Sequence, residues 1–131
     1  MENADFIQAF ETGKFPPEQF NHTAHIKLAW IYLDQFGEET AIAKTCEAIM
    51  NFDQLHGDGT KYHTTLTVAA VKAVHHFRQK SNATTFEEFI VEFPRLTTSF
   101  KELLFQHYGK GVITDPKAKT TYLEPDLLPF T

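Results

Sequence analysis

The sequence predicts an all-α fold, a compact helical bundle of about five helices with an extended C-terminal tail packed on it. Apolar residues recur with a spacing of three and four along most of the chain, and glycines stand where these stretches stop. With 131 residues, 42% of them hydrophobic, the chain is long enough for one core and too short for two. We therefore expect residues 1–131 to form a single helical domain.

A short opening helix and a longer second helix are expected in the first part of the chain. Three apolar residues between positions 6 and 10 share one helical face, and Gly13 would end that helix. Asn21 or Thr23 can cap the next helix, whose apolar positions from 28 to 36 keep helical spacing up to a glycine. This regular stripe predicts an amphipathic helix.

Two more long helices follow after short connections. Apolar positions from 42 to 55 form a second stripe that ends at Gly57. The β-branched run at residues 64–68 is compatible with a strand, but the stripe continues to Phe77 and favours a helix over about four turns. Because short connections make neighbouring helices antiparallel, the three long helices should run up, down and up.

The C-terminal part is predicted to contain shorter helices and an extended tail. Thr85 and Glu88 have the spacing of a capping box for a helix that Pro94 interrupts. A further helix is expected at about residues 97–108. Residues 122–130 are too apolar for a free tail and too rich in proline for a helix, so they should lie extended across the bundle.

Composition and charge exclude several functions. The net charge of −5, with acids and bases mixed along the chain, offers no basic stripe, so we expect no nucleic-acid partner. No apolar run is long enough to cross a bilayer, and the acidic start lacks the order of a secretory signal. We expect a cytoplasmic protein without a membrane partner. Its single cysteine, Cys46, falls on an apolar stripe and is more typical of a core residue than of a nucleophile.

Three histidines lie where helices should begin. His22 and His25 are three residues apart, so their rings project from one helical face, and His63 opens a partner helix that starts at the same end of the bundle. The helix dipole disfavours protonation there and keeps the imidazoles neutral. Three neutral imidazoles with an open fourth position are typical of a catalytic zinc or related divalent metal site. We therefore predict His22, His25 and His63 as metal ligands.

The same placement is compatible with a site that holds no metal. Two helix N-termini that face one pocket offer free N–H donors, and Lys61 adds a positive charge, so a carboxylate or phosphate could bind. Tyr62 and Tyr108 can supply hydroxyl groups or stacking faces. His107 would join them only if a kink at Pro94 returned its helix to the pocket. Lys61, Tyr62, His107 and Tyr108 are thus the predicted ligand-binding residues.

A simpler interpretation of the three histidines needs neither a metal nor a ligand. Histidines in a first helical turn are often exposed residues or caps, and the sequence alone does not prove that these side chains converge. His75 and His76, well along their helix, are expected to face solvent.

Four motifs resemble a group of small uncharacterised bacterial helical proteins. They are Phe20-Asn21-His22-Thr23-Ala24-His25 leading to Ala29-Trp30, then Lys61-Tyr62-His63-Thr64-Thr65-Leu66-Thr67, then His107-Tyr108, and finally Tyr122-Leu123-Glu124-Pro125-Asp126-Leu127. The resemblance spans nearly the whole chain in the same order, although the group has tryptophan where this chain has Tyr122. It implies that these motifs belong to one unit. It implies no substrate or mechanism.

Three classes of function follow from these observations. The first is an enzyme, metal-dependent if zinc or another divalent ion is bound, that acts on a small molecule in a pocket lined by histidine and tyrosine. The second is a non-catalytic sensor or carrier of a small anionic ligand. The third is a protein-interaction adaptor, which would carry a large exposed apolar patch instead of a concave polar pocket.

Overall fold

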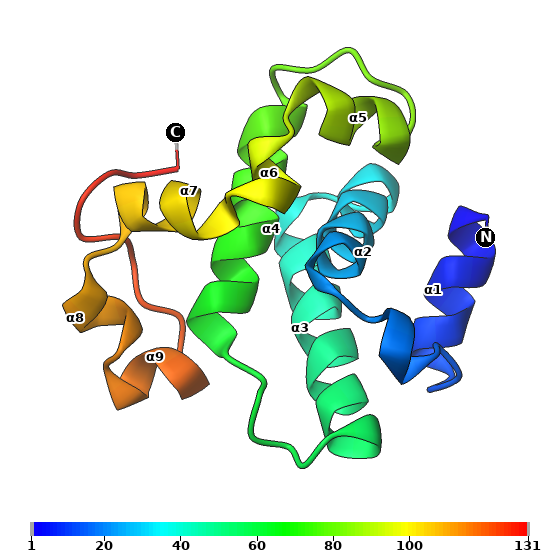
Figure 1. Ribbon diagram of the computed structural model, residues 1–131, viewed down its shortest axis with the longest axis horizontal. Coiled ribbons are helices and arrows are strands. Elements are labelled where there is room, and N and C mark those ends of the chain that lie inside the picture. The colour runs from blue at the N-terminus through cyan, green and yellow to red at the C-terminus, as the bar shows by residue number, and fades with distance from the viewer. Residues whose placement is uncertain (1, 131) are drawn as a thin grey trace.

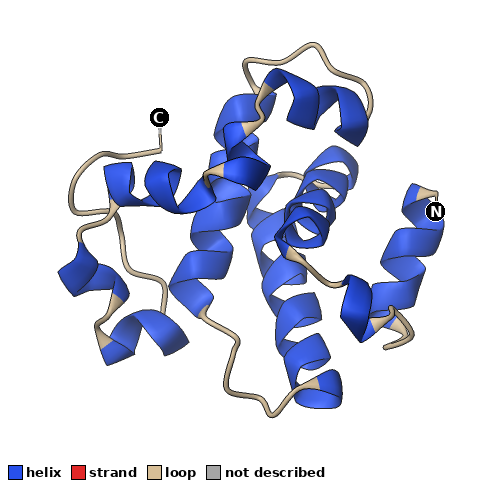
Figure 2. Ribbon diagram, viewed as in Figure 1, coloured by secondary structure: helices blue, strands red, loops and turns tan. Residues whose placement is uncertain are grey.

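The protein is described by a computed structural model that covers residues 2–130, all of it helix, turn or loop without a strand (Figures 1 and 2). The all-α prediction is confirmed, but the described residues form nine α-helices and one 3-10 helix instead of about five helices. In chain order they are α1 (Asn3–Glu11), η1 (Pro17–Gln19), α2 (His22–Gln35), α3 (Glu38–His56), α4 (Thr64–Arg78), α5 (Phe86–Glu92), α6 (Arg95–Thr98), α7 (Phe100–His107), α8 (Lys110–Ile113) and α9 (Pro116–Thr120).

The three long helices form the centre of the fold. Each of α2, α3 and α4 packs against the other two, and α3 and α4 run antiparallel (Figure 1). Six consecutive residues of α2, from 28 to 33, are buried, which means that α2 is covered on every side. Residues 64–68 lie in α4, so the prediction of a helix there in preference to a strand is confirmed.

Local capping signals set the helix boundaries. The Asn21 side chain accepts a hydrogen bond from the Ala24 N–H at 2.8 Å and so caps α2. Thr85 and Glu88 form the predicted capping box at the start of α5. Gly37 precedes α3 and Gly57 follows it, as the sequence predicts.

The helix predicted at about residues 97–108 begins only at Phe100, because the chain breaks at Ser99 into α6 and α7. Ser99 leaves the helical region with φ −142° and ψ 39°. The hydroxyls of Thr97 and Thr98 both donate to the Pro94 carbonyl, which their own backbone N–H groups also use. Such local side-chain bonds compete with helix continuation and weaken it. The direction of α7 is therefore set by this break. It is not set by a kink within one long helix.

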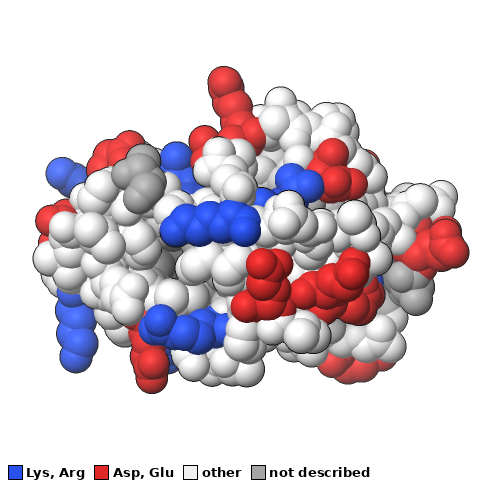
Figure 3. All heavy atoms as spheres, turned by 90° about the horizontal axis from the view of Figure 1, so that it is seen from above, with Lys and Arg blue, Asp and Glu red and all other residues white. Residues whose placement is uncertain are grey.

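The C-terminal tail is extended and lies against α4 and α7. The Leu123 N–H donates to Thr65 Oγ1 at 3.1 Å, and the Tyr108 hydroxyl donates to the Leu123 carbonyl at 2.8 Å. Further along, the Leu127 N–H donates to the His107 carbonyl, so the tail is bonded to the rest of the fold at more than one point. Within residues 2–130 no helix has the length and apolar character needed to span a bilayer. On the face shown in Figure 3, acidic and basic side chains are interspersed and no continuous basic band crosses it.

Candidate functional site

A large cavity lies where the start of α2, the end of α3, the start of α4 and the α6–α7 segment meet. Its volume is about 950 Å³. Most of its wall is apolar, and its apolar side chains include Phe20, Phe52, Leu66, Phe100, Leu104 and Phe105. A concave, mostly apolar cavity with a few polar groups is the usual form of a small-molecule site.

Five of the residues singled out in the sequence line this cavity. They are His22, His25, Lys61, Tyr62 and His63. They come from the first turn of α2 and from the loop that leads into α4, so the two helix starts share one cavity. Their local roles nevertheless differ.

His25 has a buried ring nitrogen without a partner. Its Nε2 is shielded from solvent and forms no hydrogen bond. The ring centroid lies 6.2 Å from that of His22. Burial, and next the charge of His22, lower the pKa of His25 from 6.5 to about 4. His25 is therefore a neutral imidazole at neutral pH.

His22 is held by the segment that follows α5. Its Nε2 donates to the Leu96 carbonyl at 2.9 Å, and its ring packs on Phe100 with 4.8 Å between centroids. Because a carbonyl only accepts, Nε2 carries the hydrogen of the neutral ring and Nδ1 stays the acceptor. His22 thus joins the start of α2 to α6 and α7.

His63 is the N-cap of α4. Its Nδ1 accepts a hydrogen bond from the Leu66 N–H at 3.1 Å. Burial lowers the pKa of His63, against the opposing effect of a backbone hydrogen bond at Ile113. A protonated imidazole has no acceptor nitrogen, so the cap needs the neutral ring. For His63 the interpretation as a helix cap is the one that the contacts support.

The predicted metal ligands do not form a ready coordination site. Among residues 2–130, no three histidine, cysteine, aspartate or glutamate side chains come together in a group that could hold a metal ion. Nε2 of His22 is bonded to a carbonyl, and Nδ1 of His63 is bonded to a backbone N–H. Coordination through these nitrogens would require the bonds to break. A metal at His22, His25 and His63 stays a prediction.

Asp53 organises the loop beside the cavity, and sequence analysis missed it. Its buried carboxylate accepts hydrogen bonds from the N–H groups of Lys61 and Tyr62, both at 2.8 Å. Lys119 closes the loop from the other side by donating to the carbonyls of Thr60 and Tyr62. The position of Lys61 and Tyr62 at the cavity is therefore fixed through their backbone.

The Tyr62 hydroxyl is held within the protein. It accepts a hydrogen bond from the Thr64 hydroxyl at 3.2 Å. Burial, and next a hydrogen bond with the Cys46 thiol, raise the pKa of Tyr62 to about 12. Tyr62 therefore stays a neutral phenol at physiological pH.

His107 and Tyr108 are not among the residues that line the cavity, and both contact the C-terminal tail. The His107 ring donates to the Leu128 carbonyl at 2.7 Å and stacks on Phe130 at 4.1 Å. Tyr108 is fully buried and bonds to the tail at Leu123. The break at Ser99 turns the end of α7 toward the tail, so both residues hold the tail.

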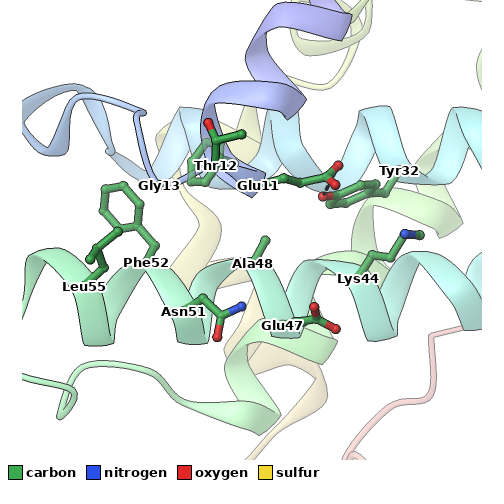
Figure 4. Close-up of a pocket in the computed structure, with 11 residues that line it drawn as sticks. Glu11, Thr12, Gly13, Tyr32, Lys44, Glu47, Ala48, Asn51, Phe52 and Leu55 are labelled. Carbon is green, nitrogen blue, oxygen red and sulfur yellow. Dashed lines mark hydrogen bonds between the residues drawn. The ribbon is translucent and has the colours of Figure 1, made fainter.

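A second, smaller hollow of about 310 Å³ lies between α1, α2 and α3 (Figure 4). The Tyr32 hydroxyl donates a long bond of 3.5 Å to Glu11, while Glu47 and Asn51 lie on α3 at its edge. These three side chains around Tyr32 belong to exposed residues. The hollow is thus a solvated surface feature, and none of the residues predicted for the site lies in it.

Comparison with known proteins provides no functional assignment. No family model matches the chain, and no curated protein or solved structure matches it either. Function therefore has to be inferred from the chemistry of the large cavity.

Proposed function

We propose that the protein binds a small, largely apolar molecule in the large cavity and acts as its carrier or sensor. The observation that carries this proposal is the cavity itself, whose wall is mostly apolar and includes a few polar side chains. This is the usual composition of a small-molecule site. The unpaired Nε2 of His25 is sealed from solvent, so it can meet a bound molecule only if its ring turns.

The cavity wall supports the apolar character of the ligand. Aromatic and aliphatic side chains form most of it, and its volume of about 950 Å³ falls within the usual range for small-molecule sites. Three of the polar lining residues, His22, His63 and Asp53, already form hydrogen bonds within the protein. The side chains of Lys61, Lys101 and Glu102, which also line the cavity, are exposed and form no hydrogen bond or ion pair among the described residues.

An enzyme acting on the same molecule is the alternative form of this proposal. A neutral imidazole can accept a proton from a bound substrate, which is the first step of general base catalysis. The carrier and the enzyme share the binding step. They differ in whether the bound molecule is recovered unchanged after incubation with the protein.

A divalent metal at His22, His25 and His63 is a second candidate, favoured by the 6.2 Å between the His22 and His25 rings. His63→Asn separates its two roles, because asparagine is an equally good N-cap but supplies no imidazole. If the three histidines hold zinc, elemental analysis of tag-free protein should find one equivalent, and His63→Asn should lose it. Protein that is metal-free after zinc addition and dialysis would exclude this candidate.

The binding proposal is tested with N-phenyl-1-naphthylamine, an uncharged apolar dye whose fluorescence rises in apolar surroundings. We expect saturable binding of one dye per protein. Leu66→Trp fills part of the cavity and should abolish it, whereas Val91→Trp adds the same ring on an exposed position of α5 and should not. No saturable binding to the wild type, or equal binding by both variants, would refute the proposal.

A further inference from the structure

Helix α7 forms one wall of the large cavity and lies between two breaks in the chain. Its residues Phe100, Leu104 and Phe105 line the cavity. The backbone leaves the helical region at Ser99, before α7, and is extended at Tyr108, after it. Residues at the ends of an element can absorb a change in backbone direction while the element itself stays intact. Helix α7 can therefore move as a unit.

The break at Ser99 follows a segment that is fixed to the core. Leu96 of α6 is fully buried, and its carbonyl accepts a hydrogen bond from His22 of α2. Helix α6 packs against α2 and α5, whereas the main backbone neighbour of α7 is α6 itself. Ser99 thus joins an anchored segment to one that is packed less closely against the long helices.

The C-terminal tail, residues 122–130, holds the other end of α7 (Figure 1). Three consecutive residues at that end, His107, Tyr108 and Gly109, form hydrogen bonds of 2.7–3.0 Å with the tail. Phe130 lines a smaller hollow of about 190 Å³ between α4 and α7. Leu104 lines both this hollow and the large cavity, so α7 separates the cavity from the end of the tail.

The same tail is bonded to α4, which forms another wall of the cavity. Thr65 of α4 is fully buried, and its hydroxyl accepts a hydrogen bond from the Leu123 N–H at 3.1 Å and donates one to the Thr121 carbonyl at 2.8 Å. The next two residues, Leu66 and Thr67, line the cavity. None of residues 122–130 lines it. The tail therefore connects two walls of the cavity from outside.

We propose that α7 is a lid that opens about Ser99, and that the tail is a clasp that holds this lid closed against α4. The inference rests on the proposed function, since the opening is the route by which a ligand enters the cavity. Leu103 and Leu104 are buried when the lid is closed, and the cost of exposing them keeps the open form rare. Loss of one clasp hydrogen bond should raise the open fraction by about two- to tenfold.

Two clasp variants and two matched controls test the proposal. Thr65→Val and Tyr108→Phe each remove a hydroxyl that is bonded to the tail, and neither residue lines the cavity. Thr45→Val is the control for the first variant, because Thr45 is also fully buried and its hydroxyl has no hydrogen-bond partner. Tyr32→Phe is the control for the second, because Tyr32 is also buried and its hydroxyl forms only a long bond to Glu11.

Amide hydrogen exchange followed by NMR measures the opening without a ligand. In the wild type, the amides of α7 should exchange faster than those of α2, because α7 needs only the lid to open. Each clasp variant should speed exchange in α7 by about two- to tenfold, and the controls should not. A tail that comes away only on global unfolding would leave this faster exchange unchanged. That result, or exchange in α7 as slow as in α2, would overturn the proposal.

Stopped-flow mixing with N-phenyl-1-naphthylamine tests whether a ligand enters through the lid. If it does, the association and dissociation rates of the dye both scale with the open fraction. The clasp variants should then raise both rates by the same factor, about two- to tenfold, and leave the Kd within about twofold of wild type. The controls should change neither rate.

The two measurements separate this inference from the proposed function. If the dye does not bind to the wild type while exchange in α7 responds to the clasp variants, the proposed function fails and the lid stands. If the dye binds but the clasp variants change neither rate, the lid is not the route of entry, and the inference is overturned while the binding function stands.

Discussion

Burial of His25 should make the protein less stable in acid by an amount that can be measured. The pKa of His25 is lowered from 6.5 to about 4, first by burial and next by the charge of His22. In the unfolded chain His25 takes up a proton below about pH 6.5, whereas in the folded protein it does so only near pH 4. Titration of His25 therefore leaves the free energy of unfolding unchanged above about pH 6.5 and lowers it progressively as the pH falls to about 4.

The size of the effect follows from the two pKa values. A pKa of about 4 in place of 6.5 corresponds to about 3 kcal/mol of unfolding free energy between neutral pH and pH 4. That is a large share of the free energy of unfolding of a typical folded domain, which is about 5–15 kcal/mol. The loss should be visible as a lower urea midpoint.

Urea unfolding of wild type and two variants at several pH values between 7.5 and 4 measures this term. His25→Gln and His25→Phe both lack a titrating side chain, so subtracting their unfolding free energy removes the contribution of all other groups. The two variants should differ in stability at pH 7 and yet show the same pH dependence. Relative to either, wild type should lose about 3 kcal/mol on acidification.

One result would refute the reasoning. If the difference between wild type and both variants stays constant from pH 7.5 to 4, His25 titrates in the folded protein as it does in the unfolded chain. Nε2 would then be open to solvent, which would contradict its burial in the structure.

Three further substitutions test individual contacts by urea unfolding. Trp30→Ala should cost about 3–5 kcal/mol, because the ring is buried between α2 and α5, and a cost near zero would contradict that packing. His63→Ala should cost about 1 kcal/mol by removing the cap of α4, while His63→Asn should match wild type; equal losses would argue against a capping role. Asp53→Ala should cost about 2 kcal/mol or more by leaving two N–H groups without an acceptor, and Asp53→Asn should cost less.

The sequence predicts those parts of the fold that depend on neighbouring residues. The cap at Asn21, the capping box at Thr85 and the glycines around α3 each act within about four residues of their own position. The helical stripe of α4 likewise outweighed the β-branched run at its start. Such signals can be read in one sequence because their partners are close along the chain.

The break at Ser99 could not be predicted in the same way. Thr97, Thr98 and Ser99 all have side chains that compete for backbone groups, but whether they break a helix depends on what the next segment packs against. Because α7 turns there, His107 bonds to Leu128 of the tail. The position of His107, which the sequence left open, thus follows from this break.

The position of Asp53 in the sequence contained a signal that could have predicted its role. It lies in the last turn of α3, where the helix dipole disfavours a negative charge. Donors near an acid at such a position offset this unfavourable interaction. The N–H groups of Lys61 and Tyr62 provide that compensation, and they also bring the loop residues to the cavity.

The contrast between His25 and His63 shows why helix-start histidines need a second feature to be interpreted. His63 is itself the N-cap, so its Nδ1 accepts from the Leu66 N–H three residues on. At α2 the corresponding bond is made by Asn21, which accepts from the Ala24 N–H. His22, which follows Asn21, bonds instead to the Leu96 carbonyl, and Nε2 of His25 has no partner. Whether a histidine at a helix start caps the helix therefore depends on which residue occupies the N-cap.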